Sequence, residues 1–152
     1  MTDEEILTLC AFEEANLEPD QGVAAVARVV LNRTKLKYMS NGTIPGTVFR
    51  HDQFSWTEWT MVNGRYLEVA KTPEQVQERA QRLIEADQSY AKRWDRARTI
   101  VDQVLAGTFT GPAYDLLGDH AVNYYNPAIC YAPWATSDKF IVAIGHHSFY
   151  RA

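Results

Sequence analysis

Residues 12–33 read FEEANLEPDQGVAAVARVVLNR. The second part of this stretch, from residue 22 to about residue 35, is apolar on nearly every side of a helix, and its main interruptions are Arg28, Asn32 and Arg33. A helix of this kind is stable only when it is covered all round. The stretch therefore predicts a helix in the middle of the core, with a few polar side chains directed to a polar edge or a cleft.

Glu14 lies just before this helix, at the end of an earlier one. Thr2 and Glu5 match a capping box, which predicts that the earlier helix starts at Thr2. Helical spacing then puts Glu14 on the same face as Ile6 and Cys10. Burial raises the pKa of a carboxyl group, and a carboxylic acid that stays protonated at neutral pH can protonate a leaving oxygen, as glycosidases and transglycosylases require. The alternative is a structural role for Glu14, either in an ion pair with Arg28 or Arg33 or as a cap on a neighbouring element.

The rest of the chain predicts two more helices and a short extended part. Thr72 opens a third helix with a capping pattern, and the apolar spacing of residues 90–106 predicts a fourth. After Pro112, residues 120–127 and 140–150 are rich in β-branched and aromatic side chains, which favours short strands. The fold class expected from this order is α+β and mainly α.

Length and composition indicate a single domain. The chain has 152 residues, with 46% hydrophobic and 22% charged residues, so we expect one domain over residues 1–152 with a substantial core. No apolar run is long enough to span a bilayer, and we expect no stable membrane insertion. The net charge of −4 argues against nucleic acid as a partner. We expect a monomer.

Three blocks of sequence together resemble the SleB-like cell-wall hydrolases, the family of spore-cortex lytic enzymes. Their order along the chain, from about residue 6 to residue 151, is more specific than any block alone. The first block is Glu14-Ala15, Glu18-Pro19 and the apolar helix ending Leu31-Asn32-Arg33, the second is Gln53-Phe54-Ser55-Trp56, and the third is Tyr124-Tyr125-Asn126-Pro127 followed by IGHHSFYR at residues 144–151.

This resemblance implies a lysozyme-like catalytic domain that acts on the glycan strands of peptidoglycan. It implies that Glu14 is the acidic catalyst, and that Gln53, Ser55, Tyr125 and Asn126 bind substrate in or near the cleft. No metal and no other cofactor is expected. The small extended C-terminal part would belong to the same single domain.

Details of the cleft are also expected from the resemblance. It puts the Tyr125 hydroxyl near the Glu14 carboxyl, and strand alternation would then send Tyr124 to the other face. Glu13 stands where the family usually has glycine, and a second carboxylate would raise the pKa of Glu14 further if both face the cleft. Residues 57–94 form a longer segment than the family pattern predicts, and we expect it to build a lobe over the cleft.

A metal centre is an alternative interpretation of the histidines. His120, Cys130, His146 and His147 are potential zinc ligands. Their spacing is poor, because adjacent residues on a strand point to opposite faces and the chain has no His-Glu-x-x-His motif. His146 is better explained as a core or hydrogen-bonding residue.

The predicted reaction is cleavage of the bond between N-acetylmuramic acid and N-acetylglucosamine. No second carboxylate is evident, and where phage-type lysozymes have an Asp nine residues after the Glu this chain has Val23. This favours a lytic transglycosylase, with a hydrolytic muramidase as the alternative in the same site. Alternatives of other classes are a wall amidase or peptidase and a non-catalytic glycan-binding or structural phage domain.

The acidic N-terminus does not resemble a signal peptide. We therefore expect a phage or prophage endolysin that stays in the cytoplasm until it is released to the cell wall.

Overall fold

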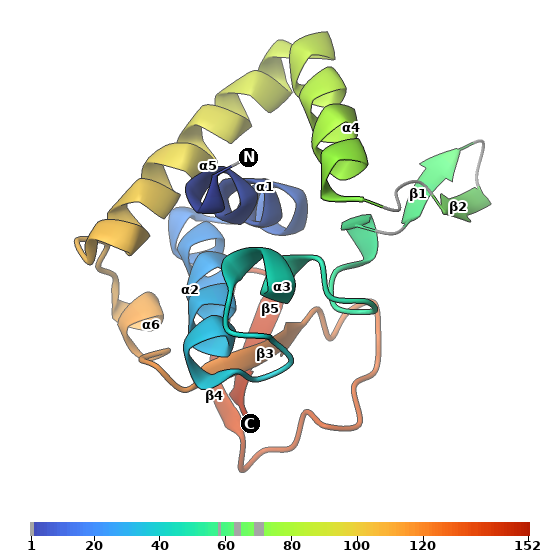
Figure 1. Ribbon diagram of the computed structural model, residues 1–152. Coiled ribbons are helices and arrows are strands. Elements are labelled where there is room, and N and C mark those ends of the chain that lie inside the picture. Colours follow the sequence, from blue (N-terminus) through green and yellow to red (C-terminus); the bar gives the residue numbers. More distant parts are fainter. Residues whose placement is uncertain (1, 58, 63–64, 69–71) are drawn as a thin grey trace.

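The computed structural model describes residues 2–57, 59–62, 65–68 and 72–152. Figure 1 shows helices around one central helix, with a small sheet at one end. The elements are α1 (Asp3–Ala15), α2 (Asp20–Leu36), α3 (Ile44–Val48), the 3-10 helix η1 (Ser55–Thr57), β1 (Trp59–Val62), β2 (Arg65–Glu68), α4 (Pro73–Ala86), α5 (Gln88–Ala106), α6 (Pro112–Asp115), β3 (Ala121–Tyr125), β4 (Phe140–Ile144) and β5 (His147–Arg151). The fold class is α+β and mainly α, as the sequence predicts.

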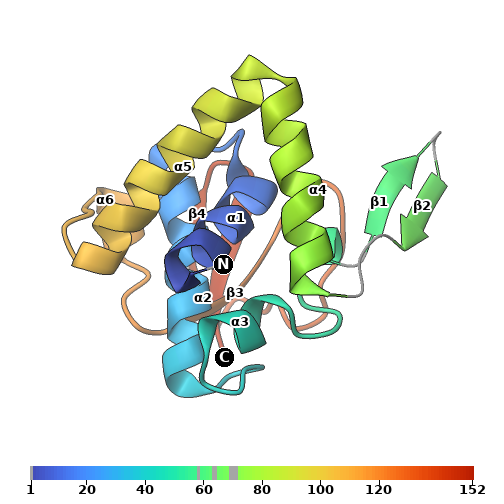
Figure 2. The same cartoon turned by 45° about the horizontal axis from the view of Figure 1, so that its top comes forward.

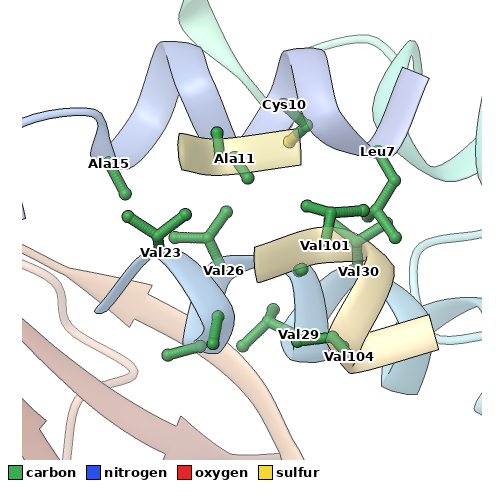
Figure 3. Close-up of a cluster of buried hydrophobic side chains, with 14 of the residues drawn as sticks. Leu7, Cys10, Ala11, Ala15, Val23, Val26, Val29, Val30, Val101 and Val104 are labelled. Atoms are coloured by element: carbon green, nitrogen blue, oxygen red, sulfur yellow. The ribbon is translucent and has the colours of Figure 1, made fainter. Parts of the chain in front are cut away.

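The apolar helix α2 is the centre of the core. Its valine and alanine side chains are 0–1% exposed, because α1 and α5 pack on it from two sides and β3 from another. Figure 3 shows side chains from α1, α2 and α5 meeting in one cluster. The labelled members are Leu7, Cys10, Ala11, Ala15, Val23, Val26, Val29, Val30, Val101 and Val104. The predicted central helix is confirmed.

Local signals set the ends of the helices. The capping box of α1 is complete, since the Thr2 side chain accepts from the Glu5 amide and the Glu5 side chain accepts from the Thr2 amide. Helix α5 ends at Gly107, whose φ of 74° is a left-handed conformation that glycine adopts without strain. No helix of the described residues is long and apolar enough to cross a membrane.

The C-terminal strands form an antiparallel sheet in the order β3-β5-β4. Polar residues at the end of α2 attach this sheet to the core. The Asn32 side-chain amide donates to the carbonyl of Ala121 at 3.0 Å, and the Arg33 guanidinium donates to the carbonyl of Val122. These buried donors satisfy backbone carbonyls at the start of β3 and so fix the strand against α2.

The segment between α3 and α5 contains a hairpin that was not among the predicted elements. β1 and β2 pair with each other, and in both views the hairpin stands to one side of the helices (Figures 1 and 2). Helix α4 packs against α5. Gln77, Gln81 and Ile84 of α4 line a pocket of about 420 Å³ together with residues of α5 and of the N-terminal half of α1.

Truncation of a core residue should test the central packing. Leu7 of α1 is 0% exposed, so Leu7→Ala should lower the free energy of unfolding by about 2–5 kcal/mol. Leu17 is 76% exposed, and the matched control Leu17→Ala should change the free energy of unfolding by less than about 0.5 kcal/mol. Urea denaturation of the two variants measures both values. Equal effects would contradict the assignment of Leu7 to the core.

Candidate active site

A pocket of about 360 Å³ lies at the C-terminal end of α1. Three segments that are far apart in the sequence form it: the end of α1 with the loop that follows, the residue after β3, and the turn between β4 and β5. The lining residues are Glu13, Glu14, Ala15, Asn16, Leu17, Glu18, Asn126, His146 and His147.

Glu14 is a pocket residue whose carboxyl group has a raised pKa. Its side chain is half-buried, and the Tyr124 hydroxyl donates to Glu14 Oε1 at 2.7 Å. Burial raises the pKa of Glu14, the hydrogen bond from Tyr124 lowers it, the charge of Glu13 raises it and the charge of Arg33 lowers it. Burial outweighs the other effects, so the pocket favours the protonated acid more than water does. The expected rise in the pKa of Glu14 is confirmed.

The prediction that Tyr125 faces Glu14 and Tyr124 faces away is wrong. Tyr124, and not Tyr125, makes the hydrogen bond to Glu14. The Tyr124 ring belongs to the face of β3 that packs on the core, between the rings of His147 at 5.0 Å and Phe149 at 5.4 Å. A register shift between Ala121 and Asn123 interrupts the strand pairing just before the tyrosines, and the sequence alone does not reveal which of the two faces inward.

Glu13 and Glu14 both line the pocket, and the charge of Glu13 raises the pKa of Glu14. This confirms the effect expected of a second carboxylate. The two residues are neighbours on one helix, so their side chains leave the helix axis about 100° apart. Both side chains therefore reach the pocket from the same helix, α1.

The alternative of an ion pair for Glu14 is not found. Among the residues described, no arginine or lysine lies within ion-pair distance of Glu14. Arg28 donates to the Tyr114 hydroxyl at 3.0 Å, and Arg33 donates to the carbonyl of Val122. Both arginines of α2 therefore bind groups other than Glu14: Arg28 binds a side chain of α6, and Arg33 binds the backbone at the start of β3.

The structure brings only Asn126, of the four expected substrate-binding residues, into this pocket. Gln53 is half-buried, and its side-chain carbonyl accepts a long hydrogen bond of 3.4 Å from Arg33. Ser55 is exposed at the start of η1. Tyr125 packs against Trp134, with ring centroids 5.6 Å apart, on the side of β3 away from Glu14. The substrate contacts of these four residues stay predictions.

Glu18 makes a contact that was not predicted from the sequence. It is 7% exposed, and its two oxygens accept from the His146 amide at 3.1 Å and meet His146 Nδ1 at 3.0 Å. Gly145 approaches so closely that a Cβ there would lie 2.0 Å from Glu18 Oε2. Glu18 therefore holds the turn between β4 and β5 against the loop after α1. His146 bonds to Glu18 as a hydrogen-bonding residue, but it is not in the core.

The candidate metal ligands do not come together. In the part of the chain that the structure describes, no group of three His, Cys, Asp or Glu residues could hold a metal ion. His120 pairs with Asp119 at 3.1 Å, and the exposed Cys130 thiol contacts the carbonyl of Asn126 at 3.4 Å.

None of the described residues of segment 57–94, which was expected to build a lobe over the cleft, lines the pocket of Glu14. Residues 58, 63–64 and 69–71 of that segment lie outside the described residues. Helix α4 contributes side chains to a different pocket, beside the N-terminal half of α1. Helix α4 of this segment contacts α5, and Figure 2 shows the two helices diverging from the point where they meet.

The raised pKa of Glu14 has a consequence for stability. Below the ordinary pKa of a glutamate, the carboxyl is neutral in the folded and unfolded chains. As the pH rises from the ordinary pKa to the raised pKa, the carboxyl ionises in the unfolded chain before it ionises in the folded chain. Wild type therefore loses stability over this range, and the loss is larger the further the pKa of Glu14 is raised. Glu14→Gln should therefore be at least as stable as wild type at neutral pH, and this advantage should shrink at acidic pH.

Asp87 provides a control of opposite sign. It caps α5 by accepting from the Ser89 amide at 2.8 Å, and this hydrogen bond lowers the pKa of Asp87. Asp87→Asn should be less stable than wild type at neutral pH, with the difference shrinking at acidic pH. Thermal denaturation of both variants across pH measures the two trends. A Glu14→Gln variant that follows the Asp87→Asn trend would contradict the raised pKa.

Comparison with solved structures finds the same fold in two bacterial enzymes. The catalytic domain of the germination-specific lytic transglycosylase SleB from Bacillus anthracis matches with a TM-score of 0.61 and 22% sequence identity, over 98% of this chain and 93% of that one. The catalytic domain of the Bacillus cereus SleB protein matches with a TM-score of 0.61 and 23% identity, over 98% of this chain and 89% of that one. At this identity the likeness establishes the fold.

Sequence comparison identifies the family. No curated protein sequence matches the chain. The sequence model of the family described as Cell Wall Hydrolase matches residues 17–150, which begins three residues after Glu14 and includes every other segment of the pocket. Because this match spans most of the chain, the protein belongs to the cell wall hydrolase family and is a peptidoglycan-degrading enzyme.

Proposed function

We propose that the protein is a lytic transglycosylase that cleaves the bond between N-acetylmuramic acid and N-acetylglucosamine, with Glu14 as its catalytic acid and base. The observation that carries the proposal is the Glu14 carboxyl itself. It lines a pocket, its pKa is raised by burial, and the Tyr124 hydroxyl fixes its orientation at 2.7 Å. Membership of the cell wall hydrolase family supports a glycan strand as the substrate.

In the first step Glu14 acts as a general acid. Its protonated carboxyl gives a proton to the glycosidic oxygen, the bond to the muramic acid carbon breaks, and positive charge develops on that sugar. Glu14 leaves this step as a carboxylate. The Tyr124 hydroxyl donates to that carboxylate and so stabilises the charge that the step creates.

In the second step the same carboxylate acts as a base. It takes the proton from the 6-hydroxyl of the muramic acid, and the freed oxygen closes on the charged carbon to form an anhydro ring. Attack by a group of the same molecule has a large advantage in proximity over attack by water. Glu14 is protonated again at the end, so the cycle needs one carboxyl group.

The positions of the other acidic residues favour this route over hydrolysis. A muramidase needs a second carboxylate across the bond, at about 5–5.5 Å from the acid for a nucleophile or about 6.5–9.5 Å for a base that activates water. Glu18 is buried with its oxygens on His146, and Asp20 pairs with Arg96 at 2.7 Å. Glu13 stands beside Glu14 on the same helix. Hydrolysis in the same pocket stays the alternative.

Glu14→Gln should abolish lysis of cell walls. Loss of general acid catalysis costs about 10²–10⁴ in rate, and the variant should still fold and bind glycan because glutamine preserves the shape of the side chain. Turbidity of a suspension of purified sacculi measures the rate. Near-normal lysis by Glu14→Gln would contradict the central assignment, and equal sacculus binding by both proteins with no lysis by either would favour a non-catalytic glycan-binding domain.

Two variants should move the pH dependence of the rate in opposite directions. Because a general acid must be protonated, the rate at low substrate falls as the pH rises through the pKa of Glu14. Tyr124→Phe removes a hydrogen bond that lowers this pKa, so its fall in rate should move to higher pH. Glu13→Gln removes a charge that raises the pKa, so its fall should move to lower pH.

Tyr125→Phe is the matched control for these profiles. Its ring packs on the other side of β3, so the pH at which the rate falls should stay at the wild-type value. A changed profile for Tyr125→Phe and an unchanged one for Tyr124→Phe would reverse the assignment of the two faces.

The products distinguish transglycosylation from hydrolysis. The proposed route predicts muropeptides that end in 1,6-anhydro-N-acetylmuramic acid, lighter than hydrolysed muropeptides by one water molecule. Mass spectrometry of sacculi digested in heavy-oxygen water measures both the mass and the uptake of label. Reducing ends that carry the label would reject the transglycosylase and support the muramidase.

A further inference from the structure

The turn between β4 and β5 presents a histidine to the pocket of Glu14. His146 lies in this turn, its side chain is 73% exposed, and it lines the pocket. The adjacent His147 differs, because its side chain is 13% exposed and its ring packs edge-on against Tyr124 at 5.0 Å. His147 is part of the wall, whereas His146 is open to a ligand.

Glu18 fixes the orientation of the His146 ring. Both contacts come from one buried carboxylate, which meets the His146 amide at 3.1 Å and the ring atom Nδ1 at 3.0 Å. A carboxylate accepts and cannot donate, so the hydrogen of this contact is on Nδ1. In the neutral ring Nε2 is then an acceptor.

Nε2 is directed away from Glu18, since the two nitrogens of an imidazole point in different directions from the ring. Within the described part of the chain, His146 has no hydrogen-bond partner besides Glu18. The turn is also shaped for this contact, because Gly145 has a φ of 58° and leaves no room for a Cβ beside Glu18 Oε2. An oriented acceptor is therefore available in the pocket wall.

We propose that His146 is a substrate-contacting residue, oriented by Glu18, whose Nε2 accepts a hydrogen bond from an N–H or O–H group of the bound glycan strand. The proposal rests on the proposed function of the same pocket. N-acetylated sugars carry amide N–H and hydroxyl donors, and an acceptor whose geometry is set in advance binds such a donor at a lower entropic cost than a mobile side chain. Glu18 acts as a positioning residue in this arrangement.

The test uses the Glu14→Gln protein, which binds without cleaving, and a soluble tetrasaccharide of alternating N-acetylglucosamine and N-acetylmuramic acid. Adding His146→Ala should weaken binding roughly 2- to 10-fold, the effect of losing one neutral hydrogen bond. His120→Ala is the matched control, because His120 is 76% exposed, also pairs with a carboxylate and does not line the pocket. Calorimetry should give unchanged affinity for this control.

NMR of the ring nitrogens provides a second measurement without a substitution at His146. In the Glu14→Gln protein, Nδ1 should carry the hydrogen and the Nε2 signal should move when the tetrasaccharide is added. Glu18→Gln should change the ratio of the two tautomers, which a purely structural role in holding the turn would not require.

The outcomes separate this inference from the proposed function. Two results together would overturn the role of His146 and leave the proposed function intact: His146→Ala binds with unchanged affinity, and the Nε2 signal does not shift when the tetrasaccharide binds. A Glu14→Gln protein that does not bind the tetrasaccharide at all would overturn both.

Discussion

A helix that is apolar on every side has to be enclosed on every side, and this requirement of α2 governs the rest of the structure. α1 and α5 supply apolar faces around it, and β3 covers a further side. The few polar side chains of α2 cannot stay unpaired in such an environment. Asn32 and Arg33 therefore donate to backbone carbonyls of β3, which positions the strand at the end of the core helix.

The candidate active site follows from this packing. With β3 fixed against α2, the Tyr124 hydroxyl meets the Glu14 carboxyl at the end of α1. The carboxyl is shielded enough from water for burial to be the largest effect on its pKa, and a pocket still reaches it. The neighbouring charge of Glu13 raises the pKa further. The location of Glu14 in the fold thus raises its pKa, and one part-buried hydrogen bond and one like charge adjust that pKa.

The sequence predicted what depends on periodicity and caps. The central helix, the capping box at Thr2, the helix over residues 90–106 and the C-terminal strands are local patterns, and all of them are present. The orientation of Tyr124 was missed because a register shift in β3 decides it, and strand alternation gives the period but not the phase.

Contacts between segments that are far apart in the sequence could not be predicted from local patterns. Glu18 and His146 are 128 positions apart, and nothing local links a carboxylate before α2 to a turn between strands. The one signal in the sequence was indirect, because Glu18-Pro19 and Gly145 both belong to the blocks that carry the family resemblance. The β1–β2 hairpin was also missed, although Asn63-Gly64 between two short runs with β-branched and aromatic residues is a sequence signal for a hairpin loop.

The most direct test of the account is the titration of the Glu14 carboxyl group itself. Carbon NMR of protein labelled in its glutamate side chains follows the carboxyl signal of Glu14 through the pH range, with Glu14→Gln to assign it. We expect the pKa of Glu14 to lie above the ordinary value of a glutamate and to rise further in Tyr124→Phe. A Glu14 pKa at or below the ordinary value would contradict the assignment of this residue as the acid that protonates the glycosidic oxygen.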